Sequence, residues 1–206
     1  MLMPNIGGIQ MKYEDLDKSS LINLLRQRDR EIEELKSNKI LLEKYAYIDD
    51  MTGVLNRRAG LDILKKTIEN NKQLESCTTV CFIDVDGLKK VNDRYGHPEG
   101  DRLLIIVSDI LKKNVRTSDI LFRLGGDEFF IVFPSLNKKK AYKVIERINE
   151  KIDEINETKK YKYKISLSIG LYEYCDEEIS SVYDIIEKAD LDMYKRKTEK
   201  DKLRRN

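Results

Sequence analysis

The sequence predicts an α/β fold of the α+β kind, in which helices pack on a mostly antiparallel sheet. Two observations support this prediction. Short segments with period-two apolar alternation are separated by longer segments with apolar residues at helical spacing. In addition, two strand-like segments are joined only by Gly125-Gly126-Asp127. So short a connection indicates an antiparallel hairpin, because glycine tolerates the positive φ that tight turns require.

The chain of 206 residues is long enough for one globular domain and an appendage. Hydrophobic residues make up 40% of it, which is enough for a core, and charged residues make up 37%. The net charge of +2 does not indicate a polycation that binds nucleic acid. No apolar run approaches the length of a membrane span, and the N-terminus lacks a signal-peptide pattern. We therefore expect a cytoplasmic protein with no nucleic-acid partner and no membrane span.

The chain contains three cysteines, and none of them forms a CxxC arrangement. This pattern argues against both a disulfide framework and a zinc site. Cys77 and Cys81 flank or lie within an apolar run, so we interpret them as small buried side chains. Free thiols agree with a reducing compartment.

The first part of the chain is predicted to be a long helix. Residues 1–12 contain Gly and Pro without periodicity, and we expect disorder there. Residues 13–47 lack Pro and Gly, and their apolar positions form one narrow seam: Leu21, Leu25, Ile32, Leu35, Leu42 and Ala46. So thin a stripe favours a dimeric coiled coil over a single helix folded onto its own domain. The globular domain then occupies residues 48–206.

Turn residues between Asp49 and Arg58 end the long helix. The next helix has its apolar face at Leu61, Leu64 and Ile68, and we expect it to end at Asn70-Asn71. The β-branched and apolar run from Thr78 to Ile83 predicts a buried strand. A helix opened by Pro98 follows, with this predicted buried face: Leu103, Ile106, Val107, Ile110 and Leu111.

The linker from Arg116 to Asp119 leads into the hairpin. The alternating apolar residues of its two strands are Ile120, Phe122 and Leu124, then Phe129, Ile131 and Phe133. After Pro134 a helix is predicted from Ala141, Val144, Ile145, Ile148, Ile152 and Ile155. A further strand is predicted from Tyr163, Ile165, Leu167, Ile169 and Leu171, and a last helix from Val182, Ile185, Ile186, Ala189 and Met193.

Carboxylates stand at the ends of two of these strands. Asp84 follows the first buried strand, and Asp127 and Glu128 lie at the hairpin turn. If the strands are neighbours, the three carboxylates converge at one sheet edge, where they suit Mg²⁺, which typically takes one or two carboxylates plus substrate phosphates. A cation there would neutralise a triphosphate and an in-line transition state, and Lys89 and Lys197 could pair with phosphates. Each charged residue taken alone is equally compatible with a solvated side chain.

The segment Gly125-Gly126-Asp127-Glu128-Phe129 is identical to the signature of the GGDEF family of diguanylate cyclases. The resemblance extends over about residues 46–200. Other segments resemble the family's motifs in order and spacing: Asp49-x-Met51-Thr52-Gly53-x-x-Asn56-Arg57-Arg58, Asp84-x-Asp86 with Lys89, Asn92-Asp93, Gly96-His97 and Gly100-Asp101, Ser168-x-Gly170, and Ala189-Asp190-x-x-Met193-Tyr194-x-x-Lys197. The joint pattern identifies the chain as a member of this family.

The resemblance implies a palm-like domain similar to nucleotidyl cyclase catalytic domains. It also implies a homodimer that condenses two GTP into cyclic di-GMP and releases two pyrophosphates, with the 3′-OH of each GTP attacking the α-phosphate of the other. By motif position, Asp84, the Val85 carbonyl, Asp127 and Glu128 would hold Mg²⁺ or Mn²⁺. Asp127 or Glu128 would also help to deprotonate the 3′-OH.

The resemblance also implies a set of substrate-binding residues. Asn92 and Asp101 would recognise guanine, and Gly125 and Gly126 would lie against GTP. The remaining members of the set are Lys89, His97 and Lys197.

Arg116-x-x-Asp119 resembles the family's inhibitory site for cyclic di-GMP. Arginine offers a planar fork that can bond a guanine edge or a phosphate, and aspartate can accept from guanine N–H groups. The simpler alternative is a surface Arg–Asp pair in a turn, which contributes little to stability.

The chain departs from the family pattern in two places. Leu88 stands where the family usually has Phe, and Lys200-Asp201-Lys202 stands where a phosphate-binding Arg is usual. Two alternatives to an active cyclase therefore remain open. One is a degenerate domain that binds GTP or cyclic di-GMP as a receptor, and the other is a dimeric scaffold. In either case a sensory partner could bind the N-terminal helix.

Overall fold

The computed structural model describes residues 17–74, 76–175 and 181–205. It divides into two compact units, Met1–Ala46 and Tyr47–Asn206. The first unit contains most of helix α1 (Lys18–Tyr47), so a helix is confirmed over the greater part of the predicted segment. The expected disorder of residues 1–12 lies outside the described residues.

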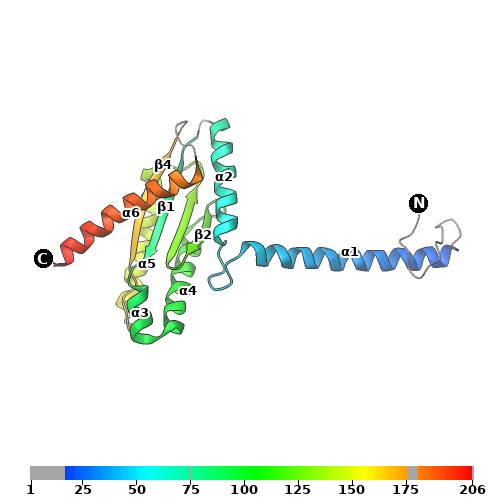
Figure 1. Ribbon diagram of the computed structural model, residues 1–206, viewed down its shortest axis with the longest axis horizontal. Helices are drawn as coiled ribbons and strands as arrows, with labels where there is room; N and C mark the ends of the chain where they lie inside the picture. The colour runs from blue at the N-terminus through cyan, green and yellow to red at the C-terminus, as the bar shows by residue number, and fades with distance from the viewer. Residues whose placement is uncertain (1–16, 75, 176–180, 206) are drawn as a thin grey trace. The chain divides into compact units, whose positions relative to one another are not determined.

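The second unit is built on a four-stranded sheet with the strand order β2-β3-β1-β4 (Figure 1). Its strands are β1 (Thr78–Val85), β2 (Ile120–Gly125), β3 (Glu128–Phe133) and β4 (Leu167–Tyr174). All three pairings are antiparallel, which confirms the predicted sheet and its hairpin. β1 therefore lies inside the sheet, where both of its edges are paired.

Helices cover the two faces of the sheet (Figure 1). The helices are α2 (Arg57–Leu74), α3 (Leu88–Tyr95), α4 (His97–Asn114), α5 (Lys138–Glu157) and α6 (Val182–Arg205). Alternate residues of β1 enter two separate cores, because successive side chains of a strand point to opposite faces. Cys81 and Ile83 pack with α4 and α5, whereas Val80 and Phe82 pack with α2 and α6.

Two predicted boundaries were wrong. α2 continues past Asn70-Asn71 to Leu74, because asparagine lowers helix propensity only slightly and does not stop a helix. The last strand begins at Leu167 rather than Tyr163. Its partner β1 ends at Val85, which pairs with Leu167. The residues before Leu167 therefore lie beyond the end of β1. The backbone N–H and C=O of Ile165 instead bond the Asn156 side chain, each at 2.8 Å.

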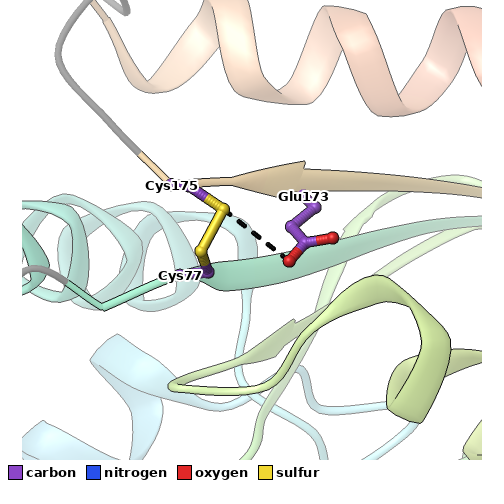
Figure 2. Close-up of side chains that lie close together, drawn as sticks. All are labelled: Cys77, Glu173 and Cys175. Carbon is purple, nitrogen blue, oxygen red and sulfur yellow. Dashed lines mark hydrogen bonds between the residues drawn. A yellow bond between two sulfur atoms is a disulfide. The ribbon is translucent and has the colours of Figure 1, made fainter.

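The expectation that Cys77 is a free, buried side chain was wrong. Cys77 forms a disulfide with Cys175, which lies 98 residues further along the chain (Figure 2). The two cysteines flank the last cross-strand pair between β1 and β4, Thr78 and Tyr174. Pairing of these strands brings the sulfurs together, and sequence spacing alone does not reveal it. Cys81 is free and fully buried, as expected.

We expect reduction of this disulfide to destabilise the domain. In the chain-entropy description, closing a loop of this length stabilises the folded state by up to about 5 kcal/mol. Urea unfolding of the wild type should show a lower midpoint in the presence of a phosphine reductant. The double variant Cys77→Ser, Cys175→Ser serves as the control and should show one midpoint under both conditions. Identical midpoints for oxidised and reduced wild type would contradict the prediction.

Candidate active site

The three predicted metal-binding carboxylates meet at one end of the sheet. Asp84 is the cross-strand partner of Glu128 in the pairing of β1 with β3. The N–H of Val85 donates to the backbone oxygen of Asp127 at 3.0 Å, which fixes the hairpin turn beside the end of β1. Directly opposite residues have Cβ atoms about 5 Å apart. The hypothesis that the two strands are adjacent is therefore confirmed, and Asp84 and Glu128 face each other across the ladder.

Lys197 of α6 lies next to Asp84. Its Nζ is 2.6 Å from Asp84 Oδ1 and 3.9 Å from Asp86 Oδ1. Asp86 is held in turn by the hydroxyls of Ser166 and Ser168, each of which donates to it at 2.6 Å. The sequence pattern gave Ser166 no role, because its contact with Asp86 spans 80 residues of the chain.

The electrostatic balance at this end of the sheet is negative. Burial raises the pKa of Asp84, the charges of Asp127 and Asp86 raise it further, and Lys197 only partly offsets these effects. The pKa of Glu128 is also raised, first by burial and then by Asp127, Asp190 and Asp84, against a smaller opposing effect of Arg57.

The carboxylate oxygens are not drawn into a tight cluster in this structure. Throughout the ranges 17–74, 76–175 and 181–205, the one group of three His, Cys, Asp or Glu side chains with ligand atoms all within 4.8 Å is Cys77, Glu173 and Cys175. Beside Asp84 the ammonium group of Lys197 provides the positive charge. The donor set of hard carboxylate oxygens with surplus negative charge nevertheless suits a divalent cation such as Mg²⁺.

The Gly125-Gly126 turn presents open backbone. Gly126 has a φ of 49°, a left-handed conformation that favours glycine. An ideal Cβ placed on either glycine would meet no atom within 4 Å, so neither glycine is needed to avoid a clash within the chain. The turn is thus an exposed surface against which a ligand can lie closely.

Arg123, which the sequence analysis gave no function, fixes this turn. Its Nε and Nη2 donate to the Gly126 carbonyl at 3.1 and 2.7 Å. Its Nη1 donates to Asp49 Oδ1 at 3.1 Å, and the two side chains are only 12% and 22% exposed. Asp49 also accepts from the N–H and the hydroxyl of Thr52, at 2.9 and 2.6 Å. Although burial opposes it, these hydrogen bonds and Arg123 lower the pKa of Asp49.

The segment after Asp49 is attached to the edge of the sheet. The N–H of Leu55 donates to Leu121 at 3.3 Å, and the N–H of Arg123 donates to Leu55 at 2.9 Å. Asn56 caps α2 by accepting from the N–H of Ala59 at 3.0 Å. The residues that the sequence suggested only as a junction therefore form a brace between β2 and the start of α2.

A second group of predicted site residues lies on α3 and α4. Asn92 Oδ1 is buried and has no hydrogen-bond partner in the structure. Gly100 lies against it: a Cβ at that position would be 1.8 Å from Asn92 Oδ1, so the Asn92 side chain would have to move. Asp101 follows on α4 and is exposed. An unpaired buried acceptor is costly, so the Asn92 oxygen would gain a partner if the side chain turned outward to a ligand N–H.

The remaining predicted positions are on the surface. The side chains of Lys89, His97 and Arg116 are exposed. Asp119 Oδ2 accepts from the backbone N–H of Arg116 at 2.8 Å, and Arg116 accepts from the N–H of Asp119 at 3.0 Å. Asp119 therefore closes the turn between α4 and β2, and the guanidinium group of Arg116 projects from that turn toward solvent.

The family described as "Diguanylate cyclase, GGDEF domain" matches residues 46–202 of the chain. Diguanylate cyclase DgcP of Escherichia coli K12 is 33% identical over 187 residues, which are 89% of this chain and 54% of DgcP. Diguanylate cyclase DosC of the same strain is 34% identical over 154 residues, which are 74% of this chain and 32% of DosC. The chain thus spans about half the length, or less, of these relatives.

Two solved structures are similar to most of the chain. The coiled coil and GGDEF domain of DgcB from Caulobacter crescentus, in complex with c-di-GMP, has a TM-score of 0.79 at 23% identity and covers 87% of this chain and 95% of DgcB. Diguanylate cyclase SiaD from Pseudomonas aeruginosa, in complex with its activator SiaC, has a TM-score of 0.69 at 26% identity. The match covers 88% of this chain and 69% of the SiaD chain. At its level of identity, the DgcB similarity supports the fold alone.

In the ranges the structure covers, no helix combines the length and apolarity that crossing a membrane requires.

The raised pKa of Glu128 leads to a prediction about stability. A carboxyl with a raised folded-state pKa stabilises the fold below its ordinary pKa and loses that contribution as the pH rises through the raised value. Glu128→Gln should therefore raise the melting temperature of the ligand-free protein at pH 7.5, and the gain should disappear as the pH falls below the ordinary glutamate pKa. Glu150→Gln, on the exposed side of α5, is the matched control and should change neither the melting temperature at pH 7.5 nor its dependence on pH. A lower melting temperature for Glu128→Gln at pH 7.5 would contradict this account.

Proposed function

The chain belongs to the GGDEF family of diguanylate cyclases, and from that premise we propose that it condenses two GTP molecules into cyclic di-GMP. In each of two steps, a ribose 3′-oxygen forms a bond to the α-phosphorus of the other GTP. The bond from that phosphorus to the bridging oxygen breaks, pyrophosphate leaves, and the 3′-OH proton is released. The observation that carries the proposal is the Asp84–Glu128 cross-strand pair beside the glycine turn of the signature.

Divalent metal use is general among diguanylate cyclases, and we propose Mg²⁺, or Mn²⁺, for this chain. Asp84, the Val85 carbonyl, Asp127 and Glu128 supply the hard oxygen donors that such an ion prefers. When bound, the ion would neutralise charge on the triphosphate and on the in-line transition state. The raised pKa of both Asp84 and Glu128 supports this role, because added positive charge would favour their ionised forms.

We propose that Lys197 changes its partner when substrate binds. In this structure the ammonium group of Lys197 lies 2.6 Å from Asp84 Oδ1, where it would meet a cation bound by that carboxylate. Like charges repel at this range, so we propose that Lys197 turns toward the phosphates when GTP and metal bind. Its side chain is 36% exposed, which leaves it room to move. Lys89 and His97 lie on the α3–α4 side of the domain and are proposed as further substrate contacts.

Guanine recognition is proposed for Asn92 and Asp101. The Asn92 oxygen, once its side chain turns outward, could accept from the base, and the exposed Asp101 carboxylate could accept from both the N1–H and the 2-amino group of guanine. Adenine does not offer this pair of donors, so the two residues would favour GTP. Gly125 and Gly126 would allow the nucleotide to lie against the backbone.

Catalysis needs two domains, because each domain would bind one of the two GTP molecules that form the product. We propose that residues 13–47 join the two domains as a coiled coil. Along α1 the side chains of Leu25, Ile32 and Leu35 are 63%, 47% and 67% exposed in the single chain. A second copy of α1 would cover this stripe and raise the effective concentration of the domains. The cyclase domain proper would then be residues 48–206. A sensory partner could act through the same helix.

We expect removal of one carboxylate charge to abolish most of the activity. Asp84→Asn and Asp127→Asn keep the side-chain size but weaken the cation site, so turnover should fall by at least about two orders of magnitude. The assay incubates pure protein with GTP and Mg²⁺ and measures cyclic di-GMP and pyrophosphate. Asp153→Asn, an exposed carboxylate on α5, is the control and should keep wild-type turnover. Nucleotide binding by the wild type without turnover would instead support the receptor alternative.

Product inhibition is proposed at Arg116 and Asp119. The exposed guanidinium group of Arg116 is available to a guanine edge or a phosphate, and a dinucleotide bound there could hold two domains with their active sites apart. Cyclic di-GMP should therefore inhibit non-competitively with GTP. Arg116→Ala should relieve this inhibition and leave the initial velocity within about two-fold of the wild type, since a surface side chain in a turn contributes little to stability.

The measurement is a set of progress curves with and without added cyclic di-GMP. Lys113→Ala, an exposed cation at the end of α4, controls for loss of surface charge and should remain inhibited. Equal inhibition of the wild type and Arg116→Ala would remove the site from the mechanism.

A further inference from the structure

A second cluster of potential ligands lies at the other end of β1, outside the proposed active site. Cys77 precedes β1, and Glu173 and Cys175 lie at and just beyond the end of β4 (Figure 2). Tyr174, between them, is buried in the core formed with α2 and α6. Side chains alternate along a strand, so Glu173 and Cys175 project to the opposite face, toward α5. The bond from the N–H of Lys138, the first residue of α5, to Glu173 Oε2 agrees with this placement.

The three side chains converge closely. One ligand atom from each of Cys77, Glu173 and Cys175 lies within 4.8 Å of the other two. Cys175 Sγ is 3.7 Å from Glu173 Oε1. In a tetrahedral zinc site, a sulfur at about 2.3 Å and an oxygen at about 2.1 Å from the metal are about 3.6 Å apart. The sulfur–oxygen edge of such a site is therefore already present.

The carboxylate of Glu173 is also held in an orientation that directs one oxygen at the sulfur of Cys175. Its Oε2 accepts from the N–H of Lys138 at 3.1 Å, while Oε1 faces the sulfur of Cys175. A hydrogen bond to one oxygen of a carboxylate fixes the direction of the other, as outer partners do for metal ligands. The carboxylate is therefore already directed at the sulfur of Cys175, and the two sulfurs would move apart on reduction to admit an ion.

We propose that the reduced, dithiol form of Cys77 and Cys175 binds one Zn²⁺ ion together with Glu173. Two thiolates and one carboxylate supply three ligands, and the exposure of Cys175 leaves the fourth position to water. Soft thiolate ligands select zinc over magnesium, so this site and the oxygen site at Asp84 would not compete for the same ion.

The disulfide and the zinc site are alternative states of the same two sulfurs. Reduction by a small-molecule thiol breaks the Cys77–Cys175 bond, yields two cysteine thiols and joins two reductant molecules as a disulfide. Binding of Zn²⁺ then displaces the two thiol protons into solvent. In reverse, a small-molecule disulfide accepts the two electrons, the cysteine pair is oxidised and the ion is released. Either state links the end of β1 to the end of β4.

The test uses the full chain, reduced with a phosphine under nitrogen and titrated with Co²⁺ as a spectroscopic probe for the zinc site. One Co²⁺ per chain should bind with sulfur-to-cobalt charge-transfer absorption, and added Zn²⁺ should remove that absorption. Cys77→Ser and Cys175→Ser should each lose most of the charge-transfer intensity. Glu173→Gln should weaken binding at least about ten-fold. The oxidised protein should show no such absorption until the reductant is added.

Matched controls separate the site from general effects. Cys81→Ala removes the buried third thiol, and Glu150→Gln removes an exposed carboxylate of α5, and both should bind like the wild type. Glu173→Gln keeps both cysteines, so it tests the site even if a serine variant fails to fold. Absence of charge-transfer absorption at saturating Co²⁺ would overturn the proposal. Its persistence in the Cys77→Ser, Cys175→Ser double variant, or its loss in Cys81→Ala, would do the same.

Discussion

β1 pairs antiparallel with β3 on one side and with β4 on the other, and its register places Asp84 opposite both Glu128 and Ser168. A slip of one residue in a strand turns every side chain to the other face. Here it would move Asp84 away from Glu128 and would also exchange the two cores that β1 separates. Burial of alternate β1 residues in both cores therefore fixes the position of the acidic site. The packing of the two cores and the placement of Asp84 beside Glu128 therefore both depend on the register of β1.

This register gathers negative charge at a cost to stability. Asp84 and Glu128 are partly buried, lie near Asp127, and have raised pKa values, which means that the fold disfavours their ionised forms. Lys197 offsets part of that cost at Asp84, and the Ser166 and Ser168 hydroxyls satisfy Asp86. A cation bound there, as proposed above, would remove part of this repulsion. Such local instability is expected where charge serves catalysis rather than stability.

Local patterns in the sequence were sufficient to predict the hairpin, every helix except α3 (Leu88–Tyr95), and the convergence of Asp84 with Asp127 and Glu128. Each of these depends on period, on turn residues or on strand ends, which are visible within a short stretch. The contact of Arg123 with Asp49 and the Cys77–Cys175 disulfide were not predicted, because they join residues 74 and 98 positions apart. Composition cannot show which distant polar groups a fold will pair. The motif resemblance marked Asp49 as part of a signature, but its bond to Arg123 came only from the structure.

Arg123 connects two of the family's motifs, the segment that begins at Asp49 and the hairpin turn at Gly125-Gly126. One guanidinium group bonds both the Gly126 carbonyl at the hairpin turn and the carboxylate of Asp49. Asp49 is followed by the brace at Leu55, which returns to β2 on either side of Phe122. Arg123 is partly buried, so the loss of either partner would leave some of its guanidinium N–H groups unpaired. The conformation of the glycine turn, and with it the position of Asp127, therefore depends on the segment that begins at Tyr47 as well as on the hairpin itself.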